Sequence, residues 1–163
     1  MIINVKNKDT LIIDEFKFKC CIGKGGFTNK KIEGDKKTPR GTFSLGKVFF
    51  RSDRIDKIQT KLVTKKIREN LGWSDNILSK NYNKEITLSN IEKGERLYRK
   101  DHKYDIFIEI KYNSEKIKPG KGSAIFLHLT KNYKPTAGCV AIDYNSMIII
   151  LKLINKKTKI RLN

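Results

Sequence analysis

Apolar and polar residues alternate along several short segments of this chain, and that pattern is typical of half-buried β-strands. The alternation is clearest over residues 104–112, where Ile106, Ile108 and Ile110 share one face. Glycine-containing and polar turns separate most of these segments, as expected for a β-rich fold. The predicted strands cover residues 2–5, 11–22, 41–46, 104–112, 123–129 and 159–162.

Helical patterns are rarer. Asp143 can cap a short helix whose inner face carries Met147, Ile150, Leu151 and Ile154. A second helix is predicted over residues 55–71.

The chain from 51 to 103 is charged and weakly periodic, which predicts an insertion or a lid. It contains no Pro/Ser-rich linker, so we expect residues 1–163 to form a single domain. The expected fold is mainly β, a β-sandwich or mixed sheet with one or two helices and this charged insertion.

The composition is strongly basic, with 36 Lys and Arg against 17 Asp and Glu and a net charge of +19. Lys dominates and is scattered, whereas nucleic-acid binders favour Arg and show a motif or basic stripe. We therefore expect no nucleic-acid partner, although attraction to an anionic polymer remains open. The longest apolar run, residues 147–151, is far shorter than the ~20 residues that span a bilayer.

Two of the three cysteines, Cys20 and Cys21, are adjacent, which is the wrong spacing for a redox or zinc pair. They are interpreted as small strand residues, and no metal site is expected. Cys139 follows a loop that begins near His128, at the end of a predicted strand. A thiol acts as a nucleophile when a base accepts its proton, and Gly138 would let backbone amides approach an oxyanion. Spacing alone is weak evidence for catalysis, and a buried cysteine with a partly buried histidine satisfied by backbone stays the alternative interpretation.

Longer motifs around this pair resemble a known family. Ser-Ala-Ile-Phe-Leu-His at 123–128 and Pro-Thr-Ala-Gly-Cys-Val-Ala-Ile at 135–142 resemble the catalytic core of YkuD-type L,D-transpeptidases. Gly-Asp-Lys-Lys-Thr-Pro-Arg-Gly-Thr-Phe at 34–43 resembles a segment of one branch of that family. The resemblance extends from about residue 20 to the C-terminus. Shorter similar stretches lie at residues 50–54, 72–75, 82–83 and 98–105.

The resemblance implies an L,D-transpeptidase catalytic domain and assigns roles to particular residues. Cys139 would be the acylated nucleophile and His128 the general base, with the carbonyl of Leu129 orienting the imidazole. The amides around Ala137, Gly138 and Cys139 would form the oxyanion hole. No metal and no cofactor would take part.

The implied substrates are peptidoglycan stem peptides. The thiolate would attack on the carboxyl side of an L-centre, as in diaminopimelate with a following D-Ala. D-Ala would leave, and an amine from a second stem would resolve the thioester. The commonest family motif has His and Arg where this chain has Ala137 and Ala141. The branch with Ser/Thr-x-Gly-Cys-x-Ala is similar to enzymes proposed to join L-Ala to diaminopimelate. In that branch a Cys often follows the Trp, whereas this chain has Ser74.

Five further residues are candidates for substrate contact: Thr136, His102, Tyr104, Asp105 and Thr38. A plain surface histidine is an equal interpretation of His102. Tyr104 and Asp105 would equally serve to anchor the strand entry, and Thr38 would shape a turn beside the active loop.

Two other functions stay open. Hydrolysis of the same thioester would make the protein an L,D-carboxypeptidase, and a dead site would leave a non-catalytic basic module that binds a polymer. A peptidoglycan enzyme is expected in the periplasm or cell envelope. Because no signal peptide is visible, a cytoplasmic location also stays open, and the oligomeric state is not indicated.

Overall fold

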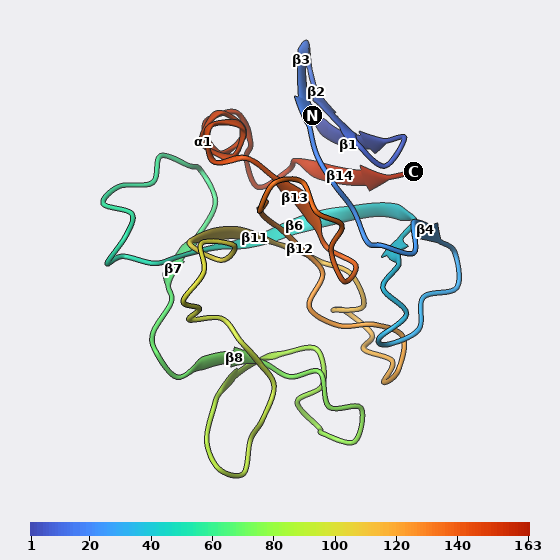
Figure 1. Ribbon diagram of the computed structural model, residues 1–163, viewed down its shortest axis with the longest axis vertical. Coiled ribbons are helices and arrows are strands. Elements are labelled where there is room, and N and C mark those ends of the chain that lie inside the picture. The colour runs from blue at the N-terminus through green and yellow to red at the C-terminus, as the bar shows by residue number, and fades with distance from the viewer.

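The computed structural model describes residues 1–163 and is mainly β, with one short helix (Figure 1). Nine strands form a mixed sheet in the order β13-β12-β11-β6-β14-β1-β2-β3, with β7 paired to β6. The prediction of a mainly β, mixed-sheet fold is confirmed. The bounds of these strands are β1 (Ile2–Lys6), β2 (Thr10–Ile13), β3 (Phe16–Lys19), β6 (Gly41–Phe50), β7 (Thr64–Lys66), β11 (Ile106–Ile110), β12 (Phe126–Leu129), β13 (Val140–Ile142) and β14 (Lys159–Leu162).

The strands β3 and β13 lie at opposite ends of the sheet. The sheet is nearly closed into a barrel because the chain that leaves β3 bonds to β13. Cys21 N–H donates to the Ala141 carbonyl at 2.9 Å, and Ala141 N–H donates back to Cys21 at 2.8 Å. Thr136 N–H then donates to the carbonyl of Ile22 at 2.9 Å. These bonds tie the loop that carries Cys139 to the first strands of the chain.

The helix α1 (Tyr144–Leu153) starts where the sequence predicts. The Asp143 side chain caps it by accepting from the Ser146 N–H at 3.0 Å. Met147 and Ile150 are completely buried in the larger of the two hydrophobic core clusters. This ten-residue helix is the only one, and none in the structure has the length and apolar character to cross a membrane.

The predicted helix over residues 55–71 is wrong. Val48 N–H donates to the Val63 carbonyl, and Ile67 N–H donates to the Phe50 carbonyl, so this stretch runs as β7 beside β6. Pairing with a strand distant in sequence satisfies its backbone better than a local helix, and the β-branched pair Val63 and Thr64 favours an extended chain.

The predicted strand over residues 11–22 is divided into β2 and β3. Asp14 adopts a positive φ of 49° and turns the chain between them, and Glu15 completes that turn.

Residues 51–103 contain a separate three-stranded sheet in the order β10-β8-β9, below the barrel in Figure 1. Its strands are β8 (Leu71–Trp73), β9 (Glu85–Thr87) and β10 (Glu95–Arg96). Outside this segment, a third, two-stranded sheet pairs β4 (Phe27–Thr28) with β5 (Thr38–Pro39). A second hydrophobic cluster joins residues of this segment to the barrel: Phe49, Ile67, Leu71, Trp73, Leu97, Tyr104, Phe107, Ala124, Phe126 and Cys139. The segment therefore packs beside Cys139. Its action as a lid stays a prediction.

Candidate active site

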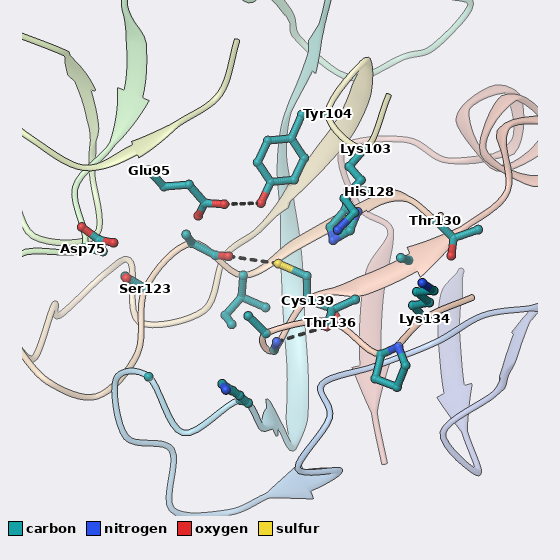
Figure 2. A pocket seen from close by; sticks show the side chains of 18 of the residues that line it. Asp75, Glu95, Lys103, Tyr104, Ser123, His128, Thr130, Lys134, Thr136 and Cys139 are labelled. Carbon is teal, nitrogen blue, oxygen red and sulfur yellow. Dashed lines mark hydrogen bonds between the residues drawn. The ribbon is translucent and has the colours of Figure 1, made fainter. Parts of the chain in front are cut away.

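A cavity of about 530 Å³ opens between the barrel and the 51–103 segment, and both Cys139 and His128 line it (Figure 2). Cys139 directly precedes β13, and His128 lies in β12, which runs parallel to β13. The parallel pairing of two neighbouring strands brings the two side chains to one cavity from positions eleven residues apart. No cluster of three or more His, Cys, Asp or Glu side chains is arranged to hold a metal ion.

The Cys139 thiol is held by the strand beside it. Its Sγ donates to the Ala124 carbonyl at 3.2 Å and accepts from the Phe126 N–H at 3.3 Å. Burial and, to a smaller extent, the charge of Glu95 raise the pKa of this thiol to about 12, against the opposing effects of Phe126 N–H and Lys31. The resting thiol is therefore neutral.

The imidazole of His128 is fixed by the carbonyl of Leu129, which lies 2.8 Å from Nδ1. With Nδ1 donating to that carbonyl, Nε2 keeps its lone pair and can accept a proton. Burial and, to a smaller extent, the charges of Lys103 and Arg99 lower the pKa of His128 to about 4, against the opposing effect of its hydrogen bond to the Leu129 carbonyl. The ring is neutral above that pH. It shares the cavity with the thiol but makes no hydrogen bond to it.

The loop before Cys139 is closed by the hydroxyl of Thr136, which donates to the Cys139 carbonyl at 2.6 Å and accepts from the Gly138 N–H at 3.1 Å. The Gly138 amide is therefore engaged within the loop. The amides of Ala137 and Cys139 have no acceptor in the protein, so they are free to face an oxyanion.

Glycine is required at position 138 by conformation and by space. Its φ is +144°, and a Cβ there would lie 3.0 Å from the Lys37 carbonyl oxygen. Thr38 supports the same loop from behind: its hydroxyl donates to the Gly138 carbonyl at 2.8 Å and accepts from the Gly23 N–H at 2.9 Å.

The structure brings only some of the predicted substrate contacts to the cavity. Thr136 and Tyr104 line it, and the Tyr104 ring packs against His128 with centroids 5.3 Å apart. Thr38 is completely buried and does not line it. His102 is 82% exposed, and its Nδ1 lies 2.6 Å from Asp105; neither residue lines the cavity. Asp105 also pairs with Arg54 at 2.6 Å, so it anchors the chain before β11.

Several charged residues line the cavity that sequence reasoning did not single out as candidates: Lys31, Glu33, Asp75, Glu95, Arg99 and Lys103. They come from segments distant in sequence, Glu95 from β10 and the others from loops, and no local pattern of residues marks them. Arg99 and Asp75 do lie in the short segments that resemble the transpeptidase branch, and that was the one available signal.

Comparison with known proteins agrees with the motifs. A family model described as YkuD, L,D-transpeptidase catalytic domain, matches residues 2–162, nearly the whole chain. No curated protein and no solved structure gives a significant match.

Proposed function

Since this chain belongs to the YkuD family of L,D-transpeptidase catalytic domains, we propose that it forms a thioester between Cys139 and a peptidoglycan stem peptide and transfers that acyl group to an amine. The observation that carries the proposal is the shared cavity. It holds the Cys139 thiol and the His128 imidazole, whose Nδ1 is bonded to the Leu129 carbonyl so that Nε2 is free. Two free amides accompany the nucleophile.

The first step starts from two neutral groups. Because burial raises the pKa of Cys139 and lowers that of His128, a standing thiolate–imidazolium pair is disfavoured in the empty cavity. The thiol proton therefore moves to Nε2 as sulfur attacks the donor carbonyl. The hydrogen bond from Sγ to the Ala124 carbonyl breaks so that the sulfur can turn towards the substrate.

The tetrahedral intermediate carries a negative oxygen, which the amides of Ala137 and Cys139 stabilise. When it collapses, the bond to the leaving D-amino acid breaks, and that amine takes the proton from His128. The thioester remains. In the second half of the reaction, His128 accepts a proton from the incoming amine, the amine attacks the thioester, and the thiol re-forms.

The type of cross-link is a finer proposal. Ala137 and Ala141 stand where the commonest family motif has a histidine and an arginine, so this chain lacks those two side chains beside Cys139. That difference supports the branch that joins L-Ala to diaminopimelate. Analysis of products from purified muropeptides tests it: dimers of that linkage support the proposal, other dimers oppose it, and shortened monomers alone indicate a carboxypeptidase.

Acylation by a carbapenem tests the chemistry directly. Intact-protein mass spectrometry should show one adduct on the wild type and on Cys20→Ala, a control that removes a buried thiol of the barrel core, and none on Cys139→Ala. Replacing His128 with Asn should slow acylation about 100-fold or more. An unmodified wild type, or an adduct that survives Cys139→Ala, would contradict the proposal and favour a non-catalytic binding module.

We also propose that the enzyme acts in the cell envelope, because that is where cross-linked stem peptides lie. Fractionation of cells that make the native protein tests this. Recovery only from the cytoplasm would direct attention to precursors or recycled fragments as substrates.

A further inference from the structure

The cavity has opposite charges on its two sides. In Figure 2, Glu95 and Asp75 lie on one side of Cys139, and Lys103 and Lys134 lie on the other. Glu33 adds a third carboxylate to the lining. A thioester formed on Cys139 would therefore be approached from one acidic and one basic direction.

The carboxylates of the acidic side are free of ion pairs. Tyr104 donates its hydroxyl proton to Oε1 of Glu95 at 2.5 Å, and Tyr82 donates to Oε2 of Glu33. Each tyrosine engages one oxygen, so the other oxygen of each carboxylate remains free to accept a bond. Asp75 makes no hydrogen bond or ion pair through its side chain.

The cations near the acidic side are already neutralised. Lys31 pairs with Asp35 at 2.5 Å, and Arg99 pairs with Asp101 at 2.7 Å; neither aspartate lines the cavity. The other lysines of the lining have no ion pair, and two of them define the basic side in Figure 2. These lysines are Lys36, Lys103, Lys131 and Lys134.

An unsatisfied hydroxyl lies on the acidic side. Ser123 is only 8% exposed, lines the cavity near Asp75, and its Oγ has no hydrogen-bond partner (Figure 2). The neighbouring Tyr82 hydroxyl is engaged by Glu33 and by the Gly122 N–H. A buried hydroxyl without a partner is unfavourable, and rotation of the Ser123 side chain into the cavity would let a ligand that donates a proton satisfy its Oγ.

We propose that Glu95, Asp75 and Ser123 form the subsite that binds the ammonium group of the acceptor substrate before it attacks the thioester. This inference rests on the proposed function. An ammonium group supplies three donors, which match the free carboxylate oxygens and the serine hydroxyl. Free carboxylates of the substrates would then lie towards Lys103 and Lys134. In the reaction, the amine loses one proton to solvent and a second to His128, its nitrogen bonds to the acyl carbon, and the carbon–sulfur bond breaks.

The test starts from enzyme already acylated by a synthetic donor tetrapeptide ending in a D-amino acid, so the acylation rate does not enter. The acyl-enzyme then reacts either with water or with an added nucleophile that competes with water. The added nucleophile is glycinamide, which carries an ammonium group, or methanol, which carries none. Mass spectrometry gives the ratio of products. In Glu95→Gln and in Asp75→Asn, the glycinamide-to-water ratio should fall about tenfold. The methanol-to-water ratio should stay within twofold.

Two controls separate charge from structure. Glu95→Asp keeps the charge and should recover most of the glycinamide ratio, whereas Glu115→Gln, outside the cavity, should not alter it. Glycinamide ratios unchanged in both acidic-side variants, or equal falls for glycinamide and methanol, overturn the subsite and leave the proposed function intact. A wild type that forms no acyl-enzyme overturns both.

Discussion

One histidine, His128, should account for a measurable part of the loss of stability of this fold on acidification. Burial lowers the pKa of His128 from 6.5 to about 4. In the unfolded chain the ring takes up its proton near pH 6.5, whereas in the folded protein it does so only near pH 4. Between these values the unfolded state binds more protons, so the free energy of unfolding falls as the pH falls. Above pH 6.5 the ring is neutral in both states and has no effect.

The size of the loss follows from the two pKa values. Each tenfold change in a proton-binding constant corresponds to about 1.4 kcal/mol, so the difference between 6.5 and about 4 amounts to roughly 3 kcal/mol. A typical domain has about 5–15 kcal/mol of stability, so this one ring accounts for a measurable part. The loss should be nearly complete just below pH 4.

Urea unfolding at pH 7 and at pH 4 measures this loss. Trp73 is a suitable fluorescent probe because it is buried against Phe126, with ring centroids 5.1 Å apart. The test variant is His128→Asn, whose side-chain amide can still donate to the Leu129 carbonyl. The other histidine provides the matched control, His102→Asn, because it is exposed and outside the cavity.

The carboxylates contribute to acid sensitivity in every variant, so the comparison between variants carries the result. The loss between pH 7 and pH 4 should be about 3 kcal/mol smaller in His128→Asn than in the wild type and in His102→Asn. An equal loss in all three proteins would refute the reasoning, since it would mean that His128 is protonated as easily in the folded state as in the unfolded one.

Three further predictions concern the same framework. The rate of acylation should fall as the pH is lowered, with a midpoint near pH 4, because His128 must be neutral to accept the thiol proton. A stopped-flow pH profile measures this. Thr38→Val should cost about 3 kcal/mol in urea unfolding by leaving the Gly23 N–H and Gly138 carbonyl without partners, whereas Thr38→Ser should cost less than half of that. Asp143→Ala should remove the cap of α1 and cost about 1 kcal/mol by the same measurement, and a change below 0.3 kcal/mol would contradict the cap.

Elements that a local pattern marks could be predicted from the sequence, whereas the stretch that depends on a distant strand could not. Alternating residues such as Ile106 and Ile108 mark a strand locally, and Asp143 marks the start of α1, so both were predicted. Residues 55–71 have helix-like spacing of apolar residues, but their structure is decided by β6, which offers an edge to pair with. A local pattern carries no information on such a partner, because pairing depends on distant chain segments.

In the candidate site, too, residues that a local motif marks could be predicted, and residues that arrive from distant segments could not. Cys139 and His128 are separated by one loop and lie on paired strands, so the sequence motif predicted that they belong together. Thr38 reaches the Gly138 carbonyl from 100 residues away. Glu95 reaches the cavity from a small sheet that has no counterpart in the strand pattern of the barrel. Such residues can be found only after the chain has folded around them.

The net charge of +19 attracts or repels other molecules over a longer distance than the few carboxylates on the acidic side of the cavity. Scattered lysines act together over about a Debye length, roughly 8–10 Å at physiological salt, and on the proposed function they attract a carboxylate-rich polymer. Glu95 and Asp75 have no ion pair despite this excess of lysine, and the nearby Lys31 and Arg99 are neutralised by other carboxylates. Added salt should therefore weaken binding of the donor polymer strongly, yet change the amine-to-water ratio of the acyl-enzyme much less. The two measurements would assign substrate attraction to the surface and acceptor orientation to the cavity.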